Sequence, residues 1–320
     1  MMTFYRVGEP AMACTDVRSC SMLVRGAFWI DLFEPSQEEE KAIEAALGFE
    51  VPTREEMKKI ETSSRLYREG DILFMTATIL NKADTSHPES SAVTFILAPR
   101  QLVTVRYAHP QPFQTFRKRV EASDRQYDSP TKSFEGLIDA ISERLAEILE
   151  RIGTQLDSIS LEVFAPPSEP SGKKRRPDFD AILRKVGRCS DLVSKARESL
   201  VSLGRLLSFF NETPEPDLHM KTVLKDLVSL GDHASFLSSK VNFLLDATLG
   251  LINIEQNAII KIVSVAAVVF LPPTLVASVY GMNFEVMPEL KWVLGYPFAI
   301  FLMISSAVLP YVLFKRKDWL

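Results

Sequence analysis

Two long uncharged segments near the C-terminus dominate the hydrophobic pattern of this 320-residue chain. Residues 262–280 (IVSVAAVVFLPPTLVASVY) contain 19 positions without a charge, and residues 292–314 (WVLGYPFAIFLMISSAVLPYVLF) contain 23. A helix needs about 20 apolar residues to cross a bilayer, so we predict two transmembrane helices. A buried core helix of a soluble protein is the alternative, and it rarely stays uncharged over such a length.

The charges that flank these segments predict their orientation. Lys261 precedes the first segment, and the basic tail 315–320 (KRKDWL) follows the second. By the positive-inside rule both outer ends face the cytoplasm, so residues 282–291 form a short extracytoplasmic loop. Two helices cannot enclose a pore, and a conducting protein of this kind therefore requires several copies around one axis.

Short alternating patterns over residues 1–125 predict an α+β domain with a small mixed sheet. Strands are expected at residues 28–32, 92–98 and 101–107, and the runs SRLYR and ILFMTATIL predict a hairpin. Ser36 with Glu39, and Thr53 with Glu56, have the spacing of capping boxes that begin helices. A further helix is expected over residues 113–121.

Long helices are predicted from Phe134 onward. Two apolar stripes at steps of three and four predict a helical hairpin within residues 126–217. From Leu218 no proline occurs before Pro272, and the periodicity continues into the first span. The predicted third helix covers residues 218–281, with 262–280 in the membrane, and 63 residues to Tyr280 would extend about 95 Å. The two stripes comprise Ile138, Ile141, Leu145, Ile148, Ile152, Leu156, Ile159 and Val163, then Ile182, Val186, Cys189, Val193, Ala196, Leu200, Leu203 and Leu207.

Composition excludes several functional classes. Residues 1–261 carry a net charge of −5, and no basic surface dominates, which argues against nucleic acid as a partner. Cys14, Cys20 and Cys189 lack paired spacing, so reduced thiols in the cytosol are expected. The first residues contain no apolar stretch, so we expect no cleaved signal peptide. The sequence lacks a Walker A loop, GxGxxG, HExxH and CxxC, so we expect no enzyme.

The first span ends in Tyr280-Gly281-Met282-Asn283, and this motif carries a resemblance. The segments GLINIEQNAIIKI, VFLPPTLVAS, YGMNFEVMPELKW, WIDLFEP and the tail KRKDWL all resemble the CorA family of divalent-cation channels. The resemblance implies a homopentamer with a funnel-shaped cytoplasmic domain, in the inner membrane of a bacterium. It also implies that the first span lines the pore and the second faces lipid. Magnesium, and as further substrates Co²⁺ and Ni²⁺, would pass down the membrane potential, and intracellular Mg²⁺ would close the gate.

The candidate selectivity filter consists of Gly281, Met282 and Asn283. Mg²⁺ gives up its water reluctantly, so a filter that holds the hydrated ion is favoured. A ring of Asn283 amides can bind the water shell and still release the ion. The alternative interpretation is that Asn283 is an ordinary turn residue. Polar and apolar positions share one face of the preceding helix. Helical spacing gives a candidate pore lining of Asn257, Ile260, Ser264, Ala267, Leu271, Thr274 and Ser278. The resemblance adds Val263 to this lining. A packed interface between helices is the alternative for this face.

Acidic residues supply the remaining candidate sites. Glu285 and Glu289 would form an acidic outer mouth, and Asp246 an acidic ring at the inner mouth. Where the family carries a regulatory acid this chain has Thr222, so Asp217, Asp226 and Asp232 are the candidates for a regulatory metal site. Two other functions stay open: a zinc transporter of the same superfamily, against which Met282 argues, and a membrane-anchored scaffold that conducts nothing.

Overall fold

A computed structural model of the chain describes residues 1–14, 23–59, 61–122, 126–164, 178–212, 218–282 and 287–316. The chain divides into two compact units, Met1–Leu245 and Asp246–Leu320. The division lies inside a long helix that begins at Leu218. The physical reason is that the first part of this helix buries apolar side chains in the N-terminal unit; these are Met220, Val223, Leu227, Ala234, Leu237, Val241 and Leu244.

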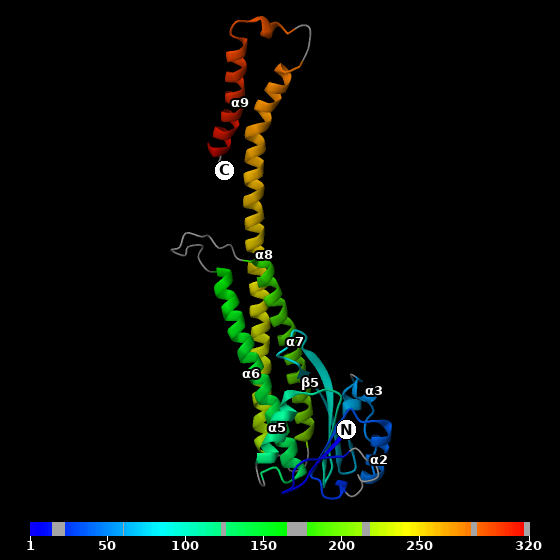
Figure 1. Cartoon of the computed structure of the whole chain (residues 1–320). Coiled ribbons are helices and arrows are strands. Elements are labelled where there is room, and N and C mark those ends of the chain that lie inside the picture. The colour runs from blue at the N-terminus through cyan, green and yellow to red at the C-terminus, as the bar shows by residue number, and fades with distance from the viewer. Residues whose placement is uncertain are drawn as a thin grey trace. The chain divides into compact units, whose positions relative to one another are not determined.

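A mixed sheet forms the centre of the N-terminal unit (Figure 1). In the described residues it has seven strands in the order β2-β1-β3-β7-β6-β5-β4. The pair β3–β7 is parallel and the other pairs are antiparallel. The predicted mixed sheet and the predicted hairpin are thus confirmed, although the sheet is larger than expected. The strands are β1 Met2–Tyr5, β2 Met12–Cys14, β3 Trp29–Phe33, β4 Leu66–Glu69, β5 Ile72–Asn81, β6 Glu89–Leu97 and β7 Leu102–Arg106.

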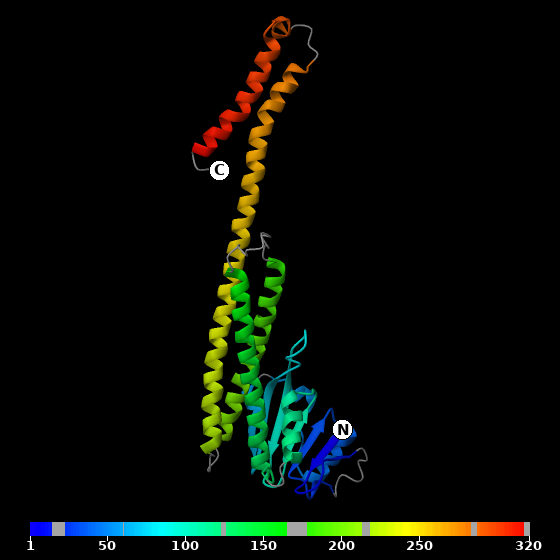
Figure 2. The same cartoon turned by 60° about the vertical axis from the view of Figure 1, so that its left-hand side comes forward.

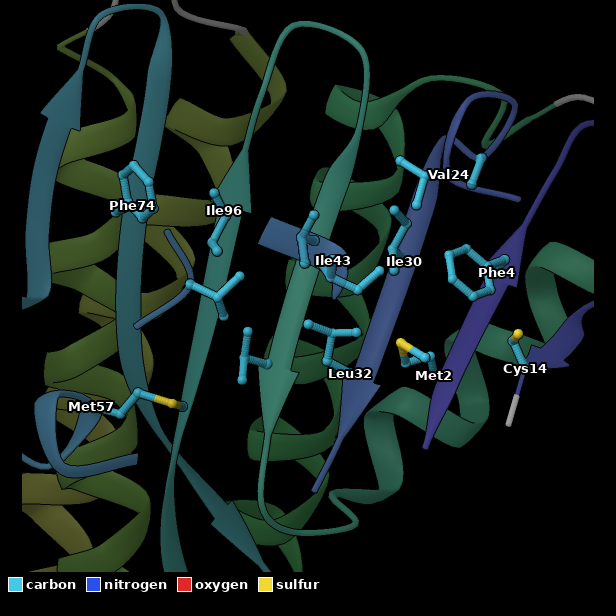
Figure 3. Close-up of a cluster of buried hydrophobic side chains, with 14 residues drawn as sticks. Met2, Phe4, Cys14, Val24, Ile30, Leu32, Ile43, Met57, Phe74 and Ile96 are labelled. Carbon is cyan, nitrogen blue, oxygen red and sulfur yellow. The ribbon is translucent and has the colours of Figure 1, made fainter. Parts of the chain in front are cut away.

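Short helices cover one face of this sheet. Helix α2 (Gln37–Leu47) begins at the predicted capping box of Ser36 and Glu39, and α3 (Arg54–Met57) begins at that of Thr53 and Glu56. Helix α4 covers Thr62–Arg65. Figure 3 shows Ile43 of α2 among strand side chains that include Ile30 and Leu32, and all three are fully buried. These contacts form the first hydrophobic core.

Longer helices cover the opposite face. Helix α5 (Gln111–Ala122), α6 (Pro130–Phe164) and α7 (Phe179–Phe210) lie beside the sheet (Figures 1 and 2). Phe134 of α6 contacts both Phe95 of β6 and Phe210 of α7, at ring-centroid distances of 5.8 and 4.9 Å. Every member of the two predicted apolar stripes is buried, so the helical hairpin that we expected from periodicity is present.

One ion pair joins the two parallel strands at the centre of the sheet. Arg106 of β7 donates to both carboxylate oxygens of Asp31 of β3, with the shortest contact at 2.8 Å. The hydroxyl of Thr104 also donates to Asp31, at 2.8 Å, and the indole of Trp29 donates to Thr104. Both charged groups are buried, and both oxygens of the carboxylate accept hydrogen bonds from Arg106 or Thr104, which offsets the cost of burying the charge.

Helix α8 covers Leu218–Tyr280, so it begins where the sequence predicted and ends one residue earlier than the predicted limit of 281. It continues through Pro272 and Pro273, and it changes direction within its gold-to-orange part (Figures 1 and 2), as expected where prolines remove hydrogen bonds. After it come η2 (Pro288–Lys291) and α9 (Gly295–Arg316). Helix α9 begins at Gly295, three residues later than the predicted second span.

Candidate ion-conduction site

Helices α8 and α9 each contain a window long and apolar enough to cross a membrane. In the apolar window of α8 none of the residues is buried in the protein, and in that of α9 6% are buried. The core helix of a soluble protein would be mostly buried, so that alternative does not fit either helix. Uncharged, uncovered helices of this length instead fit the hydrocarbon region of a bilayer.

The predicted pore positions lie on an uncovered face of α8. All eight of them are exposed, and the large ones, Ile260, Val263 and Leu271, are 61%, 62% and 66% exposed. The roughly opposite face is half-buried, which we attribute to α9, the second helix of this unit and its neighbour in both views (Figures 1 and 2). That half-buried face consists of Val265, Val268, Val269, Pro272, Pro273, Val276 and Tyr280.

The polar members of this face differ in what their side chains can still bind. The Thr274 hydroxyl donates to the Phe270 carbonyl at 2.7 Å, so its hydrogen-bonding need is met inside its own helix. Asn257 is exposed, and its side chain makes no hydrogen bond to the described residues. Its amide therefore remains available to water, an ion shell or a second copy of the chain.

The end of α8 leads directly into the candidate filter. The Gly281 amide donates to the Ala277 carbonyl at 2.9 Å, and the Met282 amide donates to Val279 at 3.3 Å. A Cβ atom at Gly281 would lie 3.1 Å from the Ala277 oxygen. This contact is tight, and the backbone would have to shift slightly to accommodate a side chain there. Asn283 and Glu285 lie outside the described residues, as does the side chain of Glu289.

The two candidate regulatory acids that the structure describes, Asp226 and Asp232, do not line the same groove. Asp226 lines a groove of about 510 Å³ between α6 and α8, whereas Asp232 lines a different groove of about 650 Å³ between α7 and α8. Asp246 is exposed at the start of the second unit, and Asp217 lies outside the described residues. Across the described ranges, no group of three or more His, Cys, Asp or Glu could hold a metal ion.

The groove around Asp226 contains residues that the sequence analysis missed. Asp139 and Glu143 of α6 line it, together with His219 of α8, whose Nε2 lies 2.9 Å from a carboxylate oxygen of Asp139. Asp139 and Glu143 are four residues apart and thus share one face of α6. That spacing was visible in the sequence, but nothing in the sequence related it to α8.

Comparison with known proteins agrees with the arrangement of two apolar helices after an α+β unit. A family model described as CorA-like Mg²⁺ transporter protein matches residues 25–316. The chain belongs to the CorA family. It is therefore a member of a family of magnesium transporters and not an enzyme.

CorA relatives match the chain over its full length. The magnesium transport protein CorA of Escherichia coli K12 is 36% identical over 324 residues, with 100% of both chains covered. That of Salmonella typhimurium is 35% identical over the same coverage. The complete CorA structure from Methanocaldococcus jannaschii has a TM-score of 0.70 at 16% identity and covers 100% of this chain and 98% of its own. The ZntB cytoplasmic domain from Vibrio parahaemolyticus reaches 0.51 at 11% identity, over 78% of this chain and 97% of its own, a likeness of fold alone.

Proposed function

We propose that this CorA-family transporter is a homopentameric channel that conducts hydrated Mg²⁺ passively into the cell. The observation that carries the proposal is the uncovered face of α8, on which Ser264 and Ser278 alternate with apolar residues within the predicted span and Asn257 lies just before it. In a bilayer, such a face is favourable only against water or another protein surface, because polar groups in hydrocarbon are costly. Copies of α8 around one axis would provide both.

The assembly is proposed to lie in the inner membrane of a bacterium, with both chain termini in the cytoplasm. Lys261 and the bases Lys315 to Lys317 support this orientation, because positive residues concentrate on the cytoplasmic side. Helix α9, with its apolar exposed side chains, would then face lipid.

Selectivity would come from a ring of Asn283 at the outer mouth. Mg²⁺ is dehydrated reluctantly, so a neutral amide that accepts hydrogen bonds from the ion's water shell can select without trapping the ion. Glu285 and Glu289 would concentrate cations outside, and Asp246 would do so at the inner end. Between them, Ile260, Val263 and Leu271 would form apolar constrictions that close by losing water.

Closure is proposed to follow from intracellular Mg²⁺ bound by acids near the start of α8, among them Asp217, Asp226 and Asp232. Since the described residues of one chain form no complete metal site, the remaining ligands would come from a neighbouring copy. Asp226 has the better support because Asp139 and Glu143 line the same groove. Asp226→Asn should then weaken inhibition of flux by internal Mg²⁺ more than Asp232→Asn does, and equal inhibition in both variants would exclude this choice.

The filter is tested by Mg²⁺ uptake into proteoliposomes. Asn283→Ala should abolish or derange uptake while native mass spectrometry still shows pentamers. Gln114→Ala removes a similar amide from an exposed position of α5, and it should leave uptake unchanged. Normal, selective uptake by the Asn283→Ala pentamer would overturn the filter assignment.

The same liposomes distinguish the alternative functions. Uptake of Mg²⁺, Co²⁺ and Ni²⁺ that follows the membrane potential supports the channel. Zinc uptake that requires a proton gradient would instead favour a zinc transporter, and the absence of flux for every ion would favour a scaffold.

A further inference from the structure

The N-terminal unit contains a recess that the transport function does not use. It has a volume of about 570 Å³, within the usual range of small-molecule sites, and it lies between the turn after β5 and the helices α6 and α7. The turn contributes Ala83 to Ser86 and Pro88. Helix α6 contributes Arg151 and Gln155, and α7 contributes Arg184, Gly187, Arg188, Asp191 and Leu192.

Ion pairs with α6 and a hydrogen bond from α7 hold the turn against the two helices. Asp84 accepts hydrogen bonds from Arg144, at 2.5 Å, and from Arg151. The hydrogen bond from Arg151 lowers the pKa of Asp84, so this carboxylate stays charged. From α7, Lys195 donates to the Pro88 carbonyl and to Asp191, both at 2.7 Å. Both carboxylates that line the recess are therefore already paired with a cation.

Hydrogen-bond donors in the recess exceed the acceptors available to them. Arg184 and Arg188 are exposed and one turn apart on α7, and neither makes a side-chain hydrogen bond or ion pair with the described residues. The Gln155 oxygen accepts a contact from the Cys189 thiol at 3.7 Å, which leaves its amide nitrogen free to donate. Between the two arginines lies Gly187, where an added Cβ would meet no atom within 4 Å. The floor of the recess is thus open to a ligand.

We propose that this recess binds a soluble polyphosphate, either inorganic or carried by a nucleoside. Guanidinium groups match phosphate oxygens with paired hydrogen bonds, and the two unpaired ones, Arg184 and Arg188, can each hold a separate phosphate of one chain. A concave site of this volume fits a compact polyanion better than a flat lipid surface does. The proposal concerns a ligand of the N-terminal unit and does not depend on the ion pathway.

The test is isothermal titration of the purified full-length chain with inorganic triphosphate, in the presence of EDTA so that metal chelation contributes no heat. We expect saturable binding with one site per chain. Arg184→Gln and Arg188→Gln should each weaken binding about tenfold or more, because charge-assisted hydrogen bonds are lost. The matched control is Arg205→Gln on the same helix, an exposed arginine outside the recess, and it should leave affinity unchanged.

Gly187→Leu fills the recess without changing its charge, and it should abolish binding while the chain remains folded by circular dichroism. A fluorescent triphosphate analogue then identifies the source of the phosphate. Displacement by free triphosphate supports the proposal. Displacement by phosphatidylglycerol vesicles but not by triphosphate would overturn it in favour of a lipid surface, and non-saturable binding or equal loss in Arg205→Gln would overturn it altogether.

Discussion

Gly136 and Gly187 lie in neighbouring helices, and the same substitution should have opposite effects at the two positions. A Cβ atom at Gly136 of α6 would lie 2.5 Å from Cε1 of Tyr127 and 2.6 Å from Cε2 of Phe116. A Cβ at Gly187 of α7 would meet nothing within 4 Å. Gly136→Ala should therefore destabilise the N-terminal unit, whereas Gly187→Ala should stabilise it.

The size of each effect follows from two opposing contributions. Alanine improves a helix interior by about 1 kcal/mol relative to glycine, and this gain applies at both positions. Overpacking of a core costs about 1–3 kcal/mol. The upper part of that range applies at Gly136, because Phe116 is fully buried and its ring lies 5.2 Å from that of Trp29. The net loss at Gly136 is then about 1–2 kcal/mol, against a gain of about 1 kcal/mol at Gly187.

Thermal unfolding in detergent measures this difference. A change of 1 kcal/mol shifts the Tm of a unit of this size by about 2–4 °C, so Gly136→Ala should lower Tm by about 2–8 °C and Gly187→Ala should raise it by about 2–4 °C. Trp29 fluorescence reports the transition if Trp292 and Trp319 are replaced by phenylalanine in every variant. A Gly136→Ala protein as stable as Gly187→Ala would refute the packing argument.

Two further predictions concern charge and burial in the same unit. Asp31→Asn leaves the Arg106 guanidinium buried without its counter-charge, so the free energy of unfolding from denaturant titration should fall by about 3–5 kcal/mol; a loss under 1 kcal/mol would contradict this. Burial, with a smaller effect from Glu40, raises the pKa of Tyr107 to about 12, above the ordinary value of about 10. The contribution of the neutral phenol to the free energy of unfolding is complete below pH 10 and is lost as the pH rises from 10 to 12. The denaturation midpoint should therefore fall less over that interval in Tyr107→Phe than in the unsubstituted protein. An unchanged pH profile would show that the phenol does not contribute.

Helix starts and helix faces could be predicted from the sequence because they depend on residues close together along the chain. The capping boxes at Ser36 and Thr53 form because each side chain accepts from an amide three residues ahead, a contact that no other part of the chain alters. The long apolar stripes likewise define one face of each helix. Strands β1 and β2 were missed because they have only four and three residues; β1 pairs with β3, more than 20 residues away, and β2 pairs with β1.

Sites that require several elements could not be predicted in this way. The recess joins Asp84, Arg151 and Arg188, which come from a turn and two helices far apart in the sequence. The groove at Asp226 depends in the same way on Asp139 of another helix. The face of α8 was accessible to sequence reasoning because all its members belong to one helix and follow from its period.

The strength of the pore proposal differs among the residues on that face. Thr274 carries little weight, because its hydroxyl is satisfied by Phe270 and would tolerate lipid or a packed helix equally. Ser264 and Ser278 have small side chains that suit close contact between helices. Asn257 precedes Lys261 and the predicted span, so water can reach its carboxamide on the cytoplasmic side of the membrane. Within the span, Ser264 and Ser278 face either lipid or a neighbouring surface, and a symmetric assembly that turns this face inward would set them against water or another helix.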